Sequence, residues 1–154
     1  ALYSEDAIAG RVEALAEEIA RSMPKDMVIV ALLKGSFVFA ADLIRALHRR
    51  GARPQIDFMT LASYGSATES CGAVTVFRDL SESVEGREVL LVDDILESGR
   101  SLDFALKSLI SRGAKEVRVA VLLEKPGKRK IEVTADFVGF VIPDHFVVGY
   151  GLDY

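Results

Sequence analysis

Two adjacent carboxylates, Asp93 and Asp94, follow directly on a short apolar run that begins at Val89. A polar turn, Glu97-Ser-Gly-Arg-Ser101, comes next and opens a predicted helix. The N-terminus of a helix offers free backbone N–H groups and the positive end of the helix dipole, which favour a bound anion such as phosphate. Neighbouring carboxylates can hold a divalent cation or accept hydrogen bonds from the vicinal hydroxyls of a sugar. A sugar phosphate fits both halves of this stretch.

The residues of the turn allow two interpretations. The hydroxyls of Ser98 and Ser101 could bind a phosphate, and Gly99 permits a close approach of the ligand or a positive φ. Alternatively, Asp94 only turns the chain and Ser101 is an ordinary N-cap. The chain contains neither Gly-x-x-x-x-Gly-Lys-Ser/Thr nor Gly-x-Gly-x-x-Gly. Hydrolysis of nucleoside triphosphates and dinucleotide redox chemistry therefore lack their usual sequence support.

Strands alternate with helices of about a dozen residues along the chain, which predicts an α/β fold. We expect one domain over residues 1–154, with a mostly parallel sheet flanked by helices on both faces. Ligands of such sheets bind beyond the carboxyl ends of the strands. The predicted strands cover 27–33, 55–62, 74–77, 89–93 and 117–123, and the predicted helices cover 8–23, 37–49 after a capping Ser36, and 102–112.

Residues from Ser63 to Gly72 are small and polar and follow no period. This composition predicts a mobile loop between two neighbouring strands. Because the site is expected at the same edge of the sheet, the loop is expected to lie over it.

Composition limits the classes of partner. The chain has 154 residues and a formal net charge of −4, with no block of lysine and arginine that could follow a nucleic-acid backbone. Its apolar runs are too short to cross a membrane as a helix. A lone Cys71 permits no internal disulfide, which suits a reducing compartment. We therefore expect a cytoplasmic protein with neither a nucleic-acid nor a membrane partner.

The stretch from Val89 to Leu102 resembles the signature with which type I phosphoribosyltransferases bind phosphoribosyl pyrophosphate, and its details resemble the hypoxanthine-guanine branch. The resemblance extends over essentially the whole chain. It implies that Asp93 and Asp94 anchor the ribose hydroxyls, directly or through a metal ion. It also implies that Ser98, Gly99, Arg100 and Ser101 hold the 5-phosphate. Glu97 stands where the branch usually has an aspartate, which is proposed as the base at purine N7.

Two further segments match the branch in sequence order. Lys34-Gly35, after Leu33, resembles its pyrophosphate loop, in which the peptide bond between the leucine and the lysine is typically cis. Ser63-Tyr64 matches the pair that the family closes over the reacting centre. Taken without the family, Lys34-Gly35 is only a polar strand end, and a tyrosine in a loop has no particular meaning.

The C-terminal part resembles the purine-binding end of the same branch. The resemblance implies that Phe146 stacks on the purine, that Val147 offers backbone hydrogen bonds and that Lys125 donates to the exocyclic oxygen. It also implies that Asp153, together with Asp93, helps to hold a magnesium ion. A lysine donor favours a 6-oxopurine over a 6-aminopurine, and an aromatic face suits any base. Structurally, Phe146 could instead be a core residue and Asp153 a surface acid.

The resemblance thus implies an enzyme that joins hypoxanthine or guanine to phosphoribosyl pyrophosphate, giving IMP or GMP and pyrophosphate. It also implies Mg²⁺ as cofactor and a homodimer or homotetramer. One alternative is a regulatory protein that binds phosphoribosyl pyrophosphate with weak activity, which Glu97 favours because it departs from the usual aspartate. Relatives also continue beyond the position of Tyr154 with residues that include a pyrophosphate-binding arginine. The other alternative is a transferase for xanthine or uracil.

Overall fold

The computed structural model describes residues 3–63 and 74–143. These residues form a six-stranded sheet in the order β3-β2-β1-β4-β5-β6, in which only the pair of β2 and β3 is antiparallel. The predicted α/β class with a mostly parallel sheet is confirmed. The strands are β1 (Val28–Leu33), β2 (Gln55–Ser63), β3 (Val74–Arg78), β4 (Glu88–Leu96), β5 (Glu116–Glu124) and β6 (Phe137–Val141).

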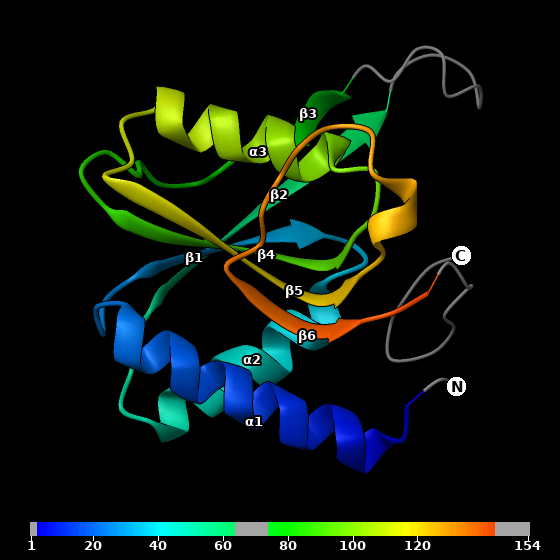
Figure 1. Ribbon diagram of the computed structural model, residues 1–154. Coiled ribbons are helices and arrows are strands. Elements are labelled where there is room, and N and C mark those ends of the chain that lie inside the picture. Colours follow the sequence, from blue (N-terminus) through cyan, green and yellow to red (C-terminus); the bar gives the residue numbers. More distant parts are fainter. Residues whose placement is uncertain (1–2, 64–73, 144–154) are drawn as a thin grey trace.

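Helices cover both faces of the sheet (Figure 1). Helices α1 (Glu5–Ser22) and α2 (Phe37–Arg49) lie on one face, and α3 (Arg100–Ser111) lies on the other. A short 3₁₀ helix, η1 (Pro126–Lys128), follows β5. None of the described helices is long and apolar enough to cross a membrane.

The central strands β1 and β4 carry continuous apolar runs because both of their faces are covered. In β1, Ile29 and Ala31 belong to the hydrophobic core beneath α1 and α2, whereas Val28 and Val30 belong to the core beneath α3. Strand β4 alternates between the two cores in the same way, and every one of these side chains is fully buried. The two cores fix the positions of β1 and β4, whose ends carry the predicted site.

The helix ends differ in detail from the sequence prediction. Ser4 caps α1 as expected and accepts a hydrogen bond from the N–H of Ala7. Ser36 precedes α2, but its backbone is already helical and its Oγ donates to the carbonyl of Leu32 at 2.5 Å, so the predicted side-chain cap is wrong. Helix α3 begins at Arg100 rather than Leu102, and its N-cap is Gly99 instead of Ser101.

Strand β6 was not predicted, because a glycine interrupts its short apolar pattern. Gly139 lies so close to β5 that a Cβ atom on it would be 2.5 Å from the carbonyl oxygen of Leu122. Glycine in a strand often marks such a close approach of two backbones. The predicted loop between Ser63 and Gly72 lies outside the described residues, except for Ser63 at the end of β2.

Candidate functional site

The carboxyl ends of β1, β4 and β5 meet at one edge of the sheet, here called the carboxyl edge. Strand β4 lies between β1 and β5 and is parallel to both, with Ala31 beside Val92 and Leu96 beside Glu124. Lys34 therefore follows the first of these strands and Lys125 follows the third. Strand β4 extends past the predicted end at Asp93, so both Asp93 and Asp94 lie within it.

Gly35 packs directly against the acid pair. A Cβ atom on Gly35 would lie 2.6 Å from Oδ2 of Asp94, so a larger residue here would require the carboxylate of Asp94 to move. The peptide bond between Leu33 and Lys34 is cis, as the resemblance implied. The predicted pyrophosphate loop and the predicted ribose anchor are thus neighbours.

The two carboxyl groups influence each other. Burial raises the pKa of Asp93 well above its ordinary value, and the nearby charge of Asp94 raises it further. Oδ1 of Asp93 also accepts a hydrogen bond of 2.8 Å from the backbone N–H of Asp94. A cation, or hydroxyl groups that donate to both carboxylates, would favour the charged form of this pair.

Residues 97–101 are here called the phosphate loop, and all of them except Arg100 line a hollow of about 190 Å³. Gly99 has a φ of +91°, which favours glycine, and a Cβ atom on it would lie 2.5 Å from the carbonyl oxygen of Ile131. The loop opens directly into α3, so the positive end of that helix dipole lies beside the hollow. The lining residues are Asp93, Ile95, Leu96, Glu97, Ser98, Gly99, Ser101 and Leu102.

Lys125 is buried beside the phosphate loop. Its side chain is 7% exposed, and its Nζ lies 3.7 Å from Oε2 of Glu97. Its backbone N–H donates to the carbonyl of Leu96 at 2.9 Å, which ties the end of β5 to the end of β4. The predicted base and the predicted purine donor therefore face each other across the ends of two adjacent strands.

The described part of the chain thus brings most of the predicted residues together, with one exception. The side chain of Arg100 lines a separate groove along α3 with Asp103 and Lys107, although its backbone N–H still faces Oγ of Ser98 at 3.3 Å. Lys34 is exposed at the end of β1. The remaining predicted residues, Tyr64, Phe146, Val147 and Asp153, lie outside the described residues, and the side chain of Ser63 is not described.

The acid pair suits a divalent cation of the magnesium type. Within residues 3–63 and 74–143, no three metal-ligating side chains gather in one place. Magnesium is usually held by one or two carboxylates together with water and substrate phosphates, rather than by a cage of protein ligands. Asp93 and Asp94 can supply that share of the ligands.

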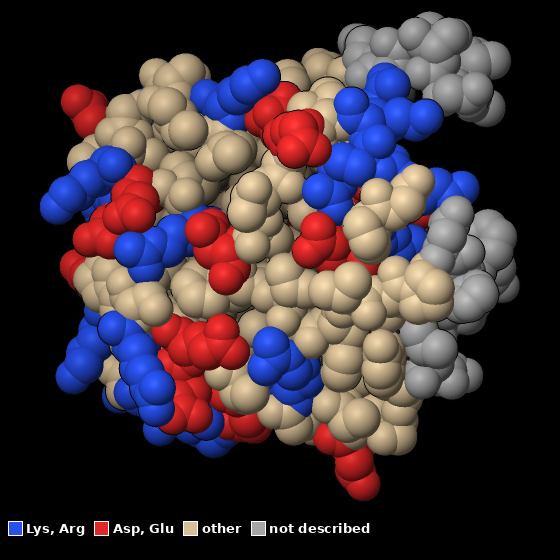
Figure 2. Space-filling model, viewed as in Figure 1, with Lys and Arg blue, Asp and Glu red and all other residues tan. Residues whose placement is uncertain are grey.

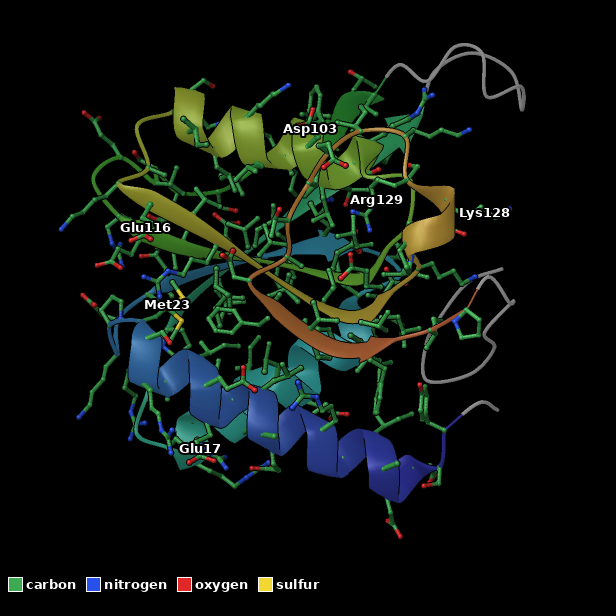
Figure 3. All side chains as sticks on the ribbon, in the orientation of Figure 1. Glu17, Met23, Asp103, Glu116, Lys128 and Arg129 are labelled. Carbon is green, nitrogen blue, oxygen red and sulfur yellow. The ribbon has the colours of Figure 1, made fainter. Side chains whose placement is uncertain are left out.

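Sequence reasoning missed Arg129, which contacts the phosphate loop. Its Nε donates to the carbonyl of Glu97 at 3.1 Å, and Figure 3 labels it beside the start of α3. Arg129 lies in the basic run Lys128-Arg-Lys130, and such runs usually form a solvated face. Figure 2 shows lysine and arginine side chains gathered on this side of the molecule. The sequence contained no signal that one of the three turns inward.

Comparison with known proteins assigns the family. A model of the phosphoribosyl transferase domain matches residues 1–154. The chain belongs to the phosphoribosyltransferase family, whose members generally act with a divalent metal cation.

The relatives agree on the branch. The chain is 43% identical to the hypoxanthine-guanine phosphoribosyltransferase of Aquifex aeolicus over 99% of its own length and 85% of that protein. A crystal structure of a hypoxanthine phosphoribosyltransferase from Staphylococcus aureus superposes with a TM-score of 0.91 at 40% identity, over 98% of this chain and 81% of that one. The predicted resemblance to the hypoxanthine-guanine branch is confirmed.

Some relatives are much longer. The chain is 42% identical to the bifunctional protein TilS/HprT of Listeria monocytogenes over 99% of its own length, and it spans only 23% of that protein.

Proposed function

We propose that this protein is a purine-salvage phosphoribosyltransferase that converts hypoxanthine or guanine and phosphoribosyl pyrophosphate to IMP or GMP and pyrophosphate. The observation that carries the proposal is the meeting of three features at the carboxyl edge. These are a largely buried acid pair, a phosphate loop at a helix N-terminus and a buried lysine. Relatives of similar length that carry the same activity in their names support it.

The phosphoribosyl half of the substrate would lie along β4. The backbone N–H groups and hydroxyls of the phosphate loop bind the 5-phosphate, where the dipole of α3 favours negative charge. Asp93 and Asp94 accept hydrogen bonds from the ribose hydroxyls. Lys34 and the backbone of Gly35, which packs on Asp94, bind the pyrophosphate.

The purine would lie beyond the ends of β4 and β5. The ammonium group of Lys125 donates to the 6-oxo group. This contact selects against a 6-aminopurine, because the ammonium group and the amino group are both donors. Phe146 stacks on the ring and Val147 supplies backbone hydrogen bonds. Glu97 accepts the proton from purine N7. Its carboxylate lies 3.7 Å from the ammonium group of Lys125, so both groups can contact the same purine.

The reaction is a displacement at the anomeric carbon of the ribose. The bond between that carbon and a purine nitrogen forms, the bond to the pyrophosphate oxygen breaks, and pyrophosphate leaves with the electron pair. The purine proton passes to the carboxylate of Glu97. A Mg²⁺ ion held by Asp93, Asp153 and substrate oxygens would neutralise the charge of the leaving pyrophosphate. Ser63 and Tyr64 would exclude water from the positively charged ribosyl centre.

Steady-state assays with phosphoribosyl pyrophosphate test the proposal. Hypoxanthine, guanine, xanthine, uracil and adenine are compared, each with Mg²⁺ and with excess chelator. We expect turnover with hypoxanthine and guanine that requires the metal, and none with adenine. Binding of phosphoribosyl pyrophosphate without turnover would favour the regulatory alternative, and a preference for xanthine or uracil would favour the other transferases.

The proposal includes a cytoplasmic location and a homodimer or homotetramer. The lone Cys71 supports the location. A study of a related Trypanosoma cruzi enzyme concerns its oligomeric state. Sedimentation velocity tests the oligomeric state. A monomer at micromolar concentration would contradict the proposed homodimer or homotetramer.

A further inference from the structure

A short stretch of chain after η1, residues 129–131, lies directly behind the phosphate loop. We propose that this stretch, here called the backing segment, aims the backbone N–H groups of the loop at the 5-phosphate, and that Arg129 is its main positioning residue. The inference rests on the proposed function for the identity of the anion. It concerns a part of the chain that is far from the acid pair in sequence and follows the purine lysine by four residues.

Arg129 makes three hydrogen bonds in three directions. Its Nε donates to the carbonyl of Glu97 at 3.1 Å, and one terminal nitrogen donates to the carbonyl of Val133 at 3.1 Å. The other terminal nitrogen pairs with the carboxylate of Glu124 at 2.8 Å. Only 17% of the Arg129 side chain is exposed, so these bonds are largely shielded from water. The planar guanidinium therefore joins the phosphate loop to the end of β5.

The two residues after Arg129 hold the next carbonyl of the loop. The backbone N–H groups of Lys130 and Ile131 both donate to the carbonyl of Ser98, at 2.8 and 3.0 Å. The carbonyl of Ile131 in turn occupies the space that a side chain at position 99 would need. Two consecutive carbonyls of the loop, those of Glu97 and Ser98, thus point toward the backing segment.

This orientation determines where the loop N–H groups point. In a trans peptide, the C=O of one residue and the N–H of the next point in opposite directions, and both peptides concerned are trans. The N–H groups of Ser98 and Gly99 therefore point away from the backing segment, and both residues line the hollow. Two adjacent N–H groups aimed together form a concave anion site, which the dipole of α3 reinforces.

The conformation of the phosphate loop depends on its hydrogen bonds to the backing segment. Glycine at position 99 gives the backbone a wide conformational range, so the loop can adopt other arrangements if its carbonyls lose their donors. Lysine at position 129 could keep the ion pair with Glu124, but one ammonium group cannot reproduce the fork that reaches Glu97 and Val133 as well. The charge of Arg129 alone is thus insufficient, and its geometry decides the affinity for phosphate.

The test compares two ligands that differ only in the 5-phosphate. Affinities for IMP and for inosine are measured by calorimetry on the wild-type protein and on the Arg129→Met and Arg129→Lys variants. We expect Arg129→Met to weaken IMP binding at least tenfold and inosine binding less than twofold. Arg129→Lys should restore at most part of the IMP affinity that Arg129→Met loses.

Arg112→Met is the matched control. Arg112 is also a partly exposed arginine that pairs with one carboxylate, Asp79, but it follows the far end of α3. Its loss should change neither affinity. If Arg129→Met does not fold, Arg129→Lys alone decides, with folding checked by thermal unfolding.

Equal losses for IMP and inosine, or an unchanged IMP affinity, would overturn the inference. A wild-type protein that binds IMP no more tightly than inosine would overturn it as well. Failure of the proposed function is a separate result, because a protein that discriminates IMP from inosine without turning over hypoxanthine would still contain the phosphate site.

Discussion

Asp93 at the carboxyl edge and two acidic residues elsewhere on the protein, Glu13 and Asp79, have opposite surroundings. Glu13 pairs with Arg49 and Arg50, and these hydrogen bonds lower its pKa. Asp79 pairs with Arg112, which lowers its pKa in the same way. Asp93 has a raised pKa because it is buried and lies next to Asp94. The charges of Glu13 and Asp79 are compensated by arginine side chains, whereas Asp93 has a second carboxylate beside it.

The contacts at the two places differ accordingly. Glu13 links α1 to α2, with Arg50 Nη1 at 2.5 Å from its Oε1. At the carboxyl edge, Lys125 Nζ and Glu97 Oε2 are 3.7 Å apart, which is longer than a hydrogen bond. The comparison predicts that substitutions at the carboxyl edge change activity more than stability, and that substitutions at the surface pairs do the reverse.

The largest effect is expected at Glu97. Glu97→Gln keeps the shape of the side chain but removes the base, and general base catalysis usually contributes about 100- to 10,000-fold. We expect kcat to fall by that order, with little change in the affinity for phosphoribosyl pyrophosphate. Single-turnover and steady-state kinetics measure both quantities.

Two further variants sharpen this prediction. Glu85→Gln alters an exposed glutamate remote from the phosphate loop and should have no effect on kcat. Glu97→Asp restores the residue usual in the branch, and comparable activity would mean that the loop accepts either length. A large gain would favour the regulatory alternative. Unchanged kcat in Glu97→Gln would remove the general base from the mechanism.

A smaller effect is expected at Lys125. Lys125→Met has a similar volume but no donor, and a buried hydrogen bond from a charged group is worth about 1.5–3 kcal/mol, or about 10- to 100-fold. We expect kcat/KM for hypoxanthine and guanine to fall by this factor, while phosphoribosyl pyrophosphate binds as before. Lys115→Met, at an exposed position before β5, is the control. Wild-type rates in Lys125→Met would mean that the purine site lies elsewhere.

The smallest effect is expected at Asp79. Its pKa is lower in the folded protein than in the unfolded chain, so its ion pair stabilises the fold above the ordinary pKa of aspartate and is lost as the pH falls through the folded value. Because this pair is largely exposed, Asp79→Asn should lower the free energy of unfolding by less than about 1 kcal/mol at pH 7. Urea titrations at pH 7 and in acid should show that this difference disappears in acid. Loss of activity in this variant would contradict the prediction that substitutions at the surface pairs change stability more than activity.

Much of the fold followed from local sequence patterns. The continuous apolar runs of β1 and β4 indicated strands covered on both faces, and helical periodicity located α1 and α2. The residues after β4 could be assigned to the site because ligands bind at the carboxyl ends of parallel strands. The role of Lys125 at the purine was implied only by the family resemblance.

The remaining features depend on contacts between distant parts of the chain. Arg129 acts on Glu97, which is 32 residues away, and no local pattern distinguishes it from Lys128 or Lys130. Gly139 allows β6 to approach β5 closely, and in the sequence the same glycine weakens the strand pattern. Ser36 was expected to cap α2 but turns back to the strand before it, because it is buried.

Backbone amide chemical shifts on titration with IMP test the central claim most directly, because they show where the ligand binds without any substitution. The account predicts large shifts for Gly35, Ser98, Gly99 and Lys125, and none around Glu13 or Asp79. Shifts confined to the α1 and α2 face, or no saturable shift at the carboxyl edge, would contradict it.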